Sequence, residues 1–514
     1  MRMLRSRNLI CALAGLTWLA AQPSLAETST APVKVSGGQI AGIVSDGLEV
    51  YLGVPFAAPP VGRLRWRPPQ PVIPWTGIKP TQSFSPACAP NADWLPNAKS
   101  EDCLYLNVWA PEGATHFPVI VWIHGGGYYG GTAGQSLFDG ARLAQHGVIV
   151  VSMNYRLGIF GFFSHPELSA ESPTKTSGNQ GIEDQIAALK WVKENITAFG
   201  GDPKRVTIMG ESAGGESVAI LMASPQARGL FQRAIAESGN DALPIDPSEN
   251  AQFDRNTAEH KGEAFAHAVG AAHLADLRAT SGEDLKKVAW SPRTVVDGYV
   301  LREDLTTTYL RHRQSDVPLL VGWNAQEGKD LAPEILDTRD FTAAKHNELV
   351  TKLLGYSPSE TLLKAYPGKT DDQAKASLNQ LTNDWWGWRM WYWAGLQAKH
   401  GQSKSYVYFF AHLPAELPNC GYGCGVGHGA EIQYVFDHLD WEARPWTAED
   451  RRLASKLGET WANFAKTGNP NATGLPAWPV FDGSNGTIHR IGSEADLKTL
   501  GQLPDFSLFP QPPK

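Results

Sequence analysis

A serine flanked by glycines is the first feature of the sequence that could do chemistry. Residues Gly210–Gly214 read GESAG and lie between a predicted strand, Arg205–Met209, and a predicted helix, Gly215–Ala223. On such a sharp turn the hydroxyl of Ser212 is exposed, and small residues two before and two after it avoid a clash. The positive end of the helix dipole points to the place where negative charge would develop. Alone, the pentapeptide is as typical of a plain glycine-rich turn.

A glycine run after an earlier strand could supply the donors that an attacked carbonyl needs. Trp122–Tyr128 reads WIHGGGY and overlaps the end of the apolar run Val119–Ile123. Glycines let backbone N–H groups approach the reacting oxygen closely, and the N–H of Ala213 would complete the set. A flexible turn is the alternative, but two such features in this order, each after a strand, favour an oxyanion hole.

With further motifs, the sequence resembles the type-B carboxylesterases, an α/β-hydrolase family that includes para-nitrobenzyl esterases and cholinesterases. The resemblance covers nearly the whole chain after residue 26. Besides the two motifs above it rests on Tyr51–Ala57, Glu101–Asn107, Asn154–Gly158, Gly178–Gly181, Asp184–Gln185 and Val296–Gly298. It implies a serine esterase without metal or other cofactor, and it assigns the oxyanion donors to Gly126, Gly127 and Ala213.

The same resemblance names an acid and a base, since the order along an α/β-hydrolase chain is serine, acid, histidine. The acid is Glu327, just after the predicted strand Val317–Trp323, although this chain has Gln326 where the family usually has an acidic residue. Asp330 and Glu334 are the competing carboxylates.

The base is His428, in the sequence GHGAE at 427–431. In this hypothesis His428 takes the proton of Ser212, and Glu327 orients the imidazole and stabilises its charged form. Glu211 and Ser238 would form a polar shell around these groups, or would merely satisfy buried backbone groups.

An aromatic cluster bears on which substrate is bound. Asp384–Trp393 reads DWWGWRMWYW, and in the family this neighbourhood contributes to the wall of the substrate gorge. The rings could pack into the core as one face of a helix. Alternatively Trp385 and Trp386, with Tyr128, line an apolar pocket in which Arg389 binds an anionic group, such as a free carboxylate of a fumonisin-type polycarboxylate ester.

The elements that must position these groups alternate between strand and helix patterns. Val148–Ser152, Arg233–Glu237 and Ser405–Phe410 add strands to those above, and Asn179–Phe199 has apolar residues at helical spacing. This alternation predicts an α/β fold with a central, mostly parallel sheet. We expect one catalytic domain, residues 27–514, with helical cap insertions at about 240–315 and 330–400.

The N-terminus and the cysteines indicate export. Residues 1–26 have a basic start, an apolar run too short to span a bilayer, and small residues before Glu27, as a secretory signal peptide does, although an uncleaved anchor is the alternative. Cleavage would remove Cys11 and leave four cysteines, which suggests two disulfides in a secreted or periplasmic protein. Of the three possible pairings we expect the local one, Cys88–Cys103 and Cys420–Cys424. Free thiols are one alternative, and a metal site of Cys420, Cys424 and His428 is another.

Composition excludes some functions and leaves others open. The 514-residue chain has a net charge of −7, which argues against a nucleic-acid partner, and no later segment is apolar enough to span a membrane. A small-molecule ester is the expected partner, and the oligomeric state is open. An amidase or thioesterase with the same triad is the alternative enzyme, and a non-catalytic binding module of cholinesterase type is the alternative outside enzymes.

Overall fold

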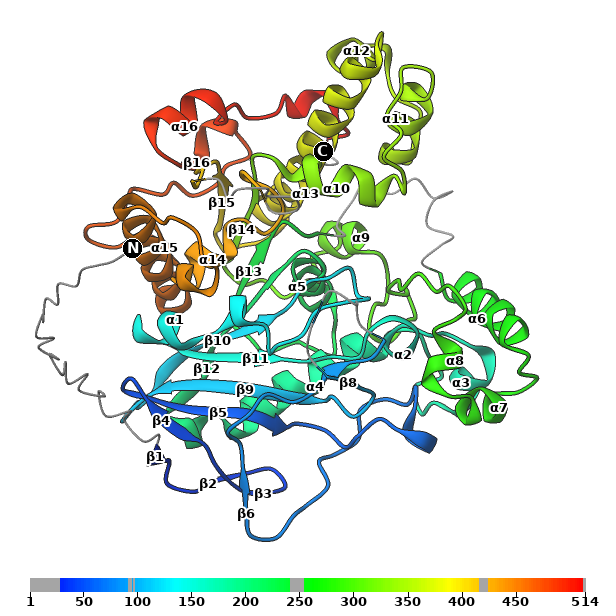
Figure 1. The fold of residues 1–514 in the computed structure, drawn as a ribbon, viewed down its shortest axis with the longest axis vertical. Helices are drawn as coiled ribbons and strands as arrows, with labels where there is room; N and C mark the ends of the chain where they lie inside the picture. The colour runs from blue at the N-terminus through cyan, green and yellow to red at the C-terminus, as the bar shows by residue number, and fades with distance from the viewer. Residues whose placement is uncertain (1–27, 91–94, 96–97, 241–253, 416–423, 512–514) are drawn as a thin grey trace, which may run out of the picture.

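A central sheet with helices on its faces organises the chain (Figure 1). The structure is a computed structural model and describes residues 28–90, 95, 98–240, 254–415 and 424–511. In this part of the chain eleven strands form the main sheet, in the order β1-β4-β5-β9-β11-β10-β12-β13-β14-β15-β16. The pairings from β11 through β16 are parallel, and those from β1 through β11 by way of β9 are antiparallel. The predicted α/β-hydrolase fold class is confirmed.

The strands of this sheet have the following bounds: β1 Thr28–Ser29, β4 Ile43–Ser45, β5 Leu48–Pro55, β9 Tyr105–Pro111, β10 Phe117–Ile123, β11 Ile149–Met153, β12 Gly201–Glu211, β13 Arg233–Glu237, β14 Leu319–Asn324, β15 Ser405–Phe410 and β16 Ile488–Ile491. Small sheets contain β2 Val33–Val35, β3 Gly38–Ala41, β6 Ile78–Pro80, β7 Ala87–Cys88 and β8 Lys99–Ser100. The apolar runs predicted as buried strands are the central ones, because a parallel strand is covered on both faces.

The register of two neighbouring strands brings the glycine run beside the serine turn. β10 and β12 are parallel neighbours, and Ile123 at the end of β10 pairs with Gly210 near the end of β12. Gly125 and Ser212 each follow the paired residues by two positions, so they leave the same edge of the sheet side by side. β11 and β12 lie on opposite sides of β10, and such a switch in strand order is where open α/β sheets place their ligand sites.

Helices cover the sheet and fill its long connections. Those on the connections between β10 and β13 are α1 Ala141–Gln145, α2 Gly158–Gly161, α3 Pro166–Glu171, α4 Gln180–Asn195 and α5 Ala213–Ala223. The predicted helix Asn179–Phe199 is α4 followed by a 3-10 turn, Ile196–Phe199. Near the C-terminus lie α14 Ile432–Val435, α15 Ala448–Thr467 and α16 Glu494–Thr499. Shorter 3-10 turns complete the described elements: Gly62–Leu64, Ser136–Phe138, Leu439–Trp441, Asn485–Thr487 and Phe506–Leu508.

Two long connections are helical in their described parts. Between β13 and β14 lie α6 Arg255–Val269, α7 Leu274–Ala279, α8 Gly282–Leu285 and α9 Leu305–Leu310. Between β14 and β15 lie α10 Glu327–Ile335, α11 His346–Leu354, α12 Glu360–Ala365 and α13 Asp371–His400. In Figure 1, α6, α7 and α8 gather at one side of the molecule, and α11 and α12 stand at its top.

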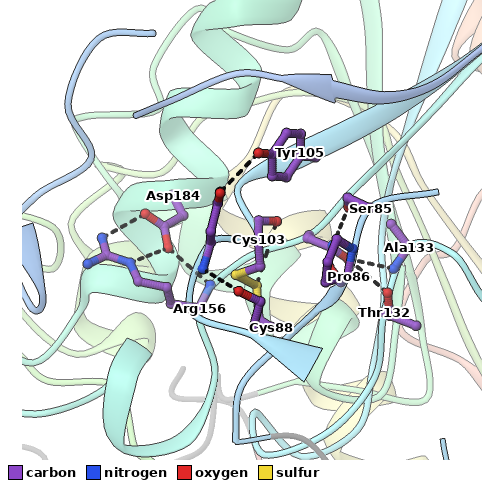
Figure 2. Close-up of a disulfide and its surroundings, with 12 residues drawn as sticks. Ser85, Pro86, Cys88, Cys103, Tyr105, Thr132, Ala133, Arg156 and Asp184 are labelled. Atoms are coloured by element: carbon purple, nitrogen blue, oxygen red, sulfur yellow. Dashed lines mark hydrogen bonds and ion pairs between the residues drawn. A yellow bond between two sulfur atoms is a disulfide. The ribbon is translucent and has the colours of Figure 1, made fainter. Parts of the chain in front are cut away.

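A disulfide closes a segment before β9, and a buried ion pair beside it joins the segment after β11 to α4. Cys88 and Cys103 are disulfide-bonded, as predicted, and close a segment with a sequence separation of 15. Beside them the guanidinium of Arg156 bonds both carboxylate oxygens of Asp184 at 2.7 Å (Figure 2). Both charged side chains are buried, so loss of either partner would leave an uncompensated charge.

The second predicted disulfide falls partly outside the described residues. Cys424 is disulfide-bonded, which contradicts a role as a thiolate metal ligand, whereas Cys420 lies outside the described residues. The predicted signal peptide, residues 1–26, lies outside them too. Within the ranges given above, no helix is long and apolar enough to cross a membrane.

Candidate active site

Ser212 sits in a strained turn between β12 and α5. Its φ of +56° and ψ of −124° are rarely adopted by a residue with a side chain. The strain is held by two backbone hydrogen bonds, from Ser212 N–H to the carbonyl of Glu237 and from Glu216 N–H to the carbonyl of Ser212, each 2.9 Å. Such local strain persists only where the surrounding structure enforces it, and it is typical of functional sites.

The two glycines of the pentapeptide are required by packing. A Cβ on Gly214 would lie within clash distance of the carbonyl oxygen of Ile123, and one on Gly210 would meet that oxygen at 2.8 Å and the backbone of Gly214 more closely still. The end of β10 is therefore in direct contact with the serine turn. This contact explains the small residues that the motif demands.

The glycine run beside Ser212 is held by its own turn and by a buried histidine. Gly126 and Gly127 have φ of +102° and +59°, and a Cβ on Gly125 would lie 2.9 Å from the Cβ of Ser212. His124 donates from Nδ1 to the carbonyl of Gly125 over 2.8 Å, and burial lowers its pKa to about 4, so its ring is neutral. Gly126 and Gly127 line the same cavity as Ser212 and Ala213, the other predicted donor.

His428 and Glu327 are brought together although 101 residues separate them. The Nδ1 of His428 lies 2.7 Å from Oε2 of Glu327, and both side chains are buried. The competing carboxylates take other partners: Asp330 accepts the backbone N–H of His428, and Glu334 accepts the hydroxyl of Tyr129. Glu327 is thus the carboxylate that orients the imidazole.

Glu327 is itself fixed by three hydrogen bonds. Its Oε1 accepts from the backbone N–H of Asn324 at 2.8 Å and from the hydroxyl of Ser238 at 2.5 Å. Its own N–H donates to the side chain of Asn383 at 2.8 Å. The predicted contact of Ser238 with the site is therefore direct, and the carboxylate has little freedom to rotate away from the histidine.

The Nε2 of His428 faces a second carboxylate. It lies 3.2 Å from Oε1 of Glu211, although it is hydrogen-bonded to none of the described residues. The ring of Trp386 contacts the imidazole edge-on at 5.8 Å between centroids. His428 and Ser212 line one cavity, so the free face of the imidazole and the serine share one space.

The charge states of His428 and Glu211 depend on each other. Burial lowers the pKa of His428, but the charges of Glu211 and Glu327 more than offset this and raise it to about 10. Burial raises the pKa of Glu211 to about 8, and the imidazolium only partly counters that effect. A proton on Glu211 would remove one charge that favours the imidazolium.

Behind this pair lies another buried carboxylate that the sequence analysis did not single out. Glu431 accepts from the side-chain amide of Asn324 at 2.5 Å and from the hydroxyl of Tyr408 at 3.2 Å. Burial raises its pKa to about 7, and the nearby charge of Glu327 adds to the effect. Glu431 could have been found from the sequence, because it belongs to the GHGAE motif. Nothing in the sequence marks Asn324 or Asn383 as part of the site, apart from their nearness to predicted elements.

The cavity that these residues face has a volume of about 1400 Å³. Its walls combine the serine turn and glycine run with segments 291–305, 352–356 and 385–389. Tyr128 is part of this wall, and its hydroxyl lies 3.3 Å from Ser217 Oγ. The space exceeds that of a typical small-ligand pocket.

The aromatic cluster divides between this cavity and the core. It lies on α13, where Trp385, Trp386 and Trp388 line the cavity, while Trp393 is buried and donates to the hydroxyl of Tyr309 at 2.6 Å. Trp391 stacks on Phe506 at 5.1 Å. Both interpretations left open by the sequence are therefore present, at different positions along one helix.

Arg389 lines the cavity but already has close neighbours. Its guanidinium lies 4.9 and 4.5 Å from the ring centroids of Trp385 and Trp386, and it donates to the carbonyl of Asn240. It also lies 3.5 Å from a carboxylate oxygen of Glu216. Two more cationic side chains, Arg293 and Lys352, line the same cavity and are exposed.

Comparison with known proteins gives matches over most of the chain. Residues 29–505 match the model of the carboxylesterase family. The chain is 35% identical to fumonisin B1 esterase of Sphingopyxis macrogoltabida over 509 residues, covering 92% of this chain and 88% of that protein. It is 35% identical to liver carboxylesterase 1 of Oryctolagus cuniculus, covering 94% of each, and 35% identical to cocaine esterase of Homo sapiens, covering 94% of this chain and 92% of that protein.

Replacing Gly214 by alanine should destabilise the protein through the serine turn. The added Cβ would collide with the carbonyl oxygen of Ile123, so we expect Gly214→Ala to lower the free energy of unfolding by about 2 kcal/mol or more in urea titration. Gly486→Ala is the matched control, because its Cβ would meet only one side-chain oxygen at 3.7 Å. Equal stability of the two variants would contradict the packing argument.

Proposed function

Because this chain belongs to the carboxylesterase family, we propose that Ser212, His428 and Glu327 form the catalytic triad with which it hydrolyses carboxylic esters. The observation that carries the proposal is the 2.7 Å bond between His428 and Glu327, since His428 lines the cavity that also contains strained Ser212. Enzymes of this family are carboxylic ester hydrolases, and a serine, an imidazole and a carboxylate are sufficient for that reaction.

The first half of the reaction transfers the acyl group to the enzyme. His428 Nε2 takes the proton of Ser212 Oγ as this oxygen attacks the ester carbonyl, and the backbone N–H groups of Gly126, Gly127 and Ala213 stabilise the oxyanion. The C–O bond of the ester then breaks, and His428 returns the proton to the leaving alcohol. In the second half water attacks the acyl-enzyme while His428 takes one of its protons. The bond between the acyl carbon and Ser212 Oγ then breaks, His428 returns the proton to that oxygen, and the acid leaves.

Glu327 and Glu211 have different parts in this scheme. Glu327 holds the Nδ1–H and therefore presents Nε2 as the atom that accepts the serine proton. Glu211 lies on the Nε2 side and stabilises the imidazolium that forms during attack. The imidazole must be neutral to accept a proton, and the charge of Glu211 raises the pKa of His428. Glu211 therefore also raises the lowest pH at which the enzyme works.

We further propose that the enzyme is exported and that its substrate is a bulky ester, including esters with free carboxylates. The disulfide Cys88–Cys103 supports an oxidising compartment, together with the signal-peptide pattern of residues 1–26. The cavity volume and the cationic side chains of Arg293, Lys352 and Arg389 on its wall support a large anionic substrate. The similarity to fumonisin B1 esterase points the same way.

Removal of the Ser212 hydroxyl tests the triad directly. Ser212→Ala should reduce kcat for p-nitrophenyl butyrate by about 10⁴-fold or more, since the nucleophile is lost and only the oxyanion donors remain. Diethyl p-nitrophenyl phosphate should add one diethylphosphoryl group to the wild type and none to this variant, and the same intact mass reports whether the exported chain begins at Glu27. Ser507→Ala, an exposed serine, is the control. Unchanged turnover of Ser212→Ala would reject the mechanism.

Neutralising Glu211 should widen the working range toward acid. Activity rises with pH as His428 loses its proton, and the charge of Glu211 raises the pKa of His428. Glu211→Gln removes that charge, so the acid limb of the kcat/KM profile for a neutral ester should move to lower pH by about one unit or more. Glu348→Gln, on the exposed side of α11, should leave the limb in place. A limb that is unmoved or shifts to higher pH would exclude this role of Glu211.

Charge on the cavity wall should distinguish anionic from neutral esters. We expect Arg293→Gln to raise KM about fivefold for a p-nitrophenyl ester with a terminal carboxylate, since an exposed ion pair contributes up to about 1 kcal/mol. KM for its neutral methyl ester should not change. Arg389→Ala should show the same selectivity, and Arg302→Gln, exposed outside the cavity lining, should not. Equal effects on the two esters would argue against carboxylate recognition.

A further inference from the structure

A second cavity lies apart from the active site, between α4 and a proline-rich segment. Its volume is about 480 Å³, and none of its lining residues belongs to the lining of the active-site cavity. One wall is segment 68–72, which reads PPQPV, and the opposite wall is one face of α4. Along that face Glu183, Ala187, Lys190 and Glu194 follow one another at spacings of four, three and four residues, as neighbours on a helix do.

Glu183 is the unusual side chain of this cavity. It is only partly exposed, it lines the cavity, and it makes no hydrogen bond or ion pair with any residue that the structure describes. The adjacent carboxylate differs completely, because Asp184 is bound on both oxygens by Arg156. Glu183 therefore offers the cavity a carboxylate with which no described residue forms an ion pair.

None of the charged groups near Glu183 within the described residues is paired with its carboxylate. Arg156 is already engaged with Asp184, Asp297 accepts backbone N–H groups of the loop before α9, and the charge of Lys190 is only a minor influence. Lys190 is exposed and within the described residues forms no ion pair. Burial raises the pKa of Glu183 to about 8, and the charge of Arg156 counters this only in part.

The rest of the lining suits a cation with apolar substituents. Three aromatic residues, Phe56, Trp191 and Tyr299, stand around the cavity with the prolines and Ile186. Aromatic faces attract cations, and a carboxylate nearby adds a direct charge partner. With Glu183 and Glu194 against Lys190, the lining carries more acidic than basic groups.

We propose that this cavity is a second binding site, for an organic ammonium ion, in which Glu183 is the anionic partner and Phe56, Trp191 and Tyr299 surround the apolar part. The site would not take part in ester hydrolysis, because it contains no residue of the serine turn, the glycine run or the histidine segment. It does share a segment with the active site: Tyr299 lies between Val296 and Leu301, both of which line the larger cavity.

Binding of benzyltrimethylammonium, measured by isothermal titration calorimetry on the full enzyme, tests the proposal. We expect Glu183→Gln to weaken binding about tenfold, because the charge partner is lost while the shape is kept. Ala187→Leu keeps Glu183 but fills the cavity, and it should weaken binding as well. Glu360→Gln, on an exposed position of α12, is the matched control and should bind as the wild type does. Thermal unfolding of each variant checks that the fold is retained.

The pH dependence gives an independent readout. The probe is permanently charged, so affinity of the wild type should rise as Glu183 ionises with increasing pH, and that of Glu183→Gln should stay flat. Neopentylbenzene, a neutral molecule of the same shape, should bind more weakly than the cation. The proposal is overturned if Glu183→Gln and Ala187→Leu bind like the wild type, which would place the probe in the active-site cavity, or if the neutral analogue binds as tightly.

Discussion

The contact between the end of β10 and the serine turn is the constraint from which the rest of the active site follows. Gly214 lies so close to the carbonyl of Ile123 that no side chain fits between them. The parallel register of β10 with β12 places Gly125 next to Ser212 through the same contact. Nucleophile and candidate oxyanion donors are therefore positioned by one packing arrangement of backbone against backbone, which is more rigid than any arrangement of side chains.

A second constraint is the concentration of buried carboxylates around one imidazole. Glu211 and Glu327 are both within 3.2 Å of the ring of His428, and Glu431 lies just behind them. Burial makes a negative charge on a carboxylate unfavourable, whereas the positive charge of the imidazolium stabilises the carboxylates that it contacts. The fold tolerates this because donors hold the carboxylates: Asn324 alone contributes its backbone N–H to Glu327 and its amide to Glu431.

The sequence predicted the backbone of the site better than its side-chain contacts. The serine turn, the glycine run and most strands around them follow from local rules, because glycine spacing and apolar runs report directly on backbone geometry. The contact of Glu211 with Nε2 of His428 joins two residues that are 217 positions apart in the sequence, and nothing in the sequence around either residue indicates it. The aromatic cluster was left between two interpretations for a physical reason: α13 is buried on most sides, so it has no single apolar stripe that periodicity could assign.

The separation between the sheet and its two long helical connections has a consequence for how such an enzyme can diversify. The groups assigned to the chemistry leave the ends of β10, β12 and β14 and the segment after β15, whereas much of the cavity wall comes from α11, α13 and the segment before α9. Insertions, deletions or exchanges in those connections could reshape the space for substrate without altering the strand register. Homologues could thus acquire new substrates by exchanging these two helical connections, while the strand ends that hold the groups assigned to the chemistry stay unchanged.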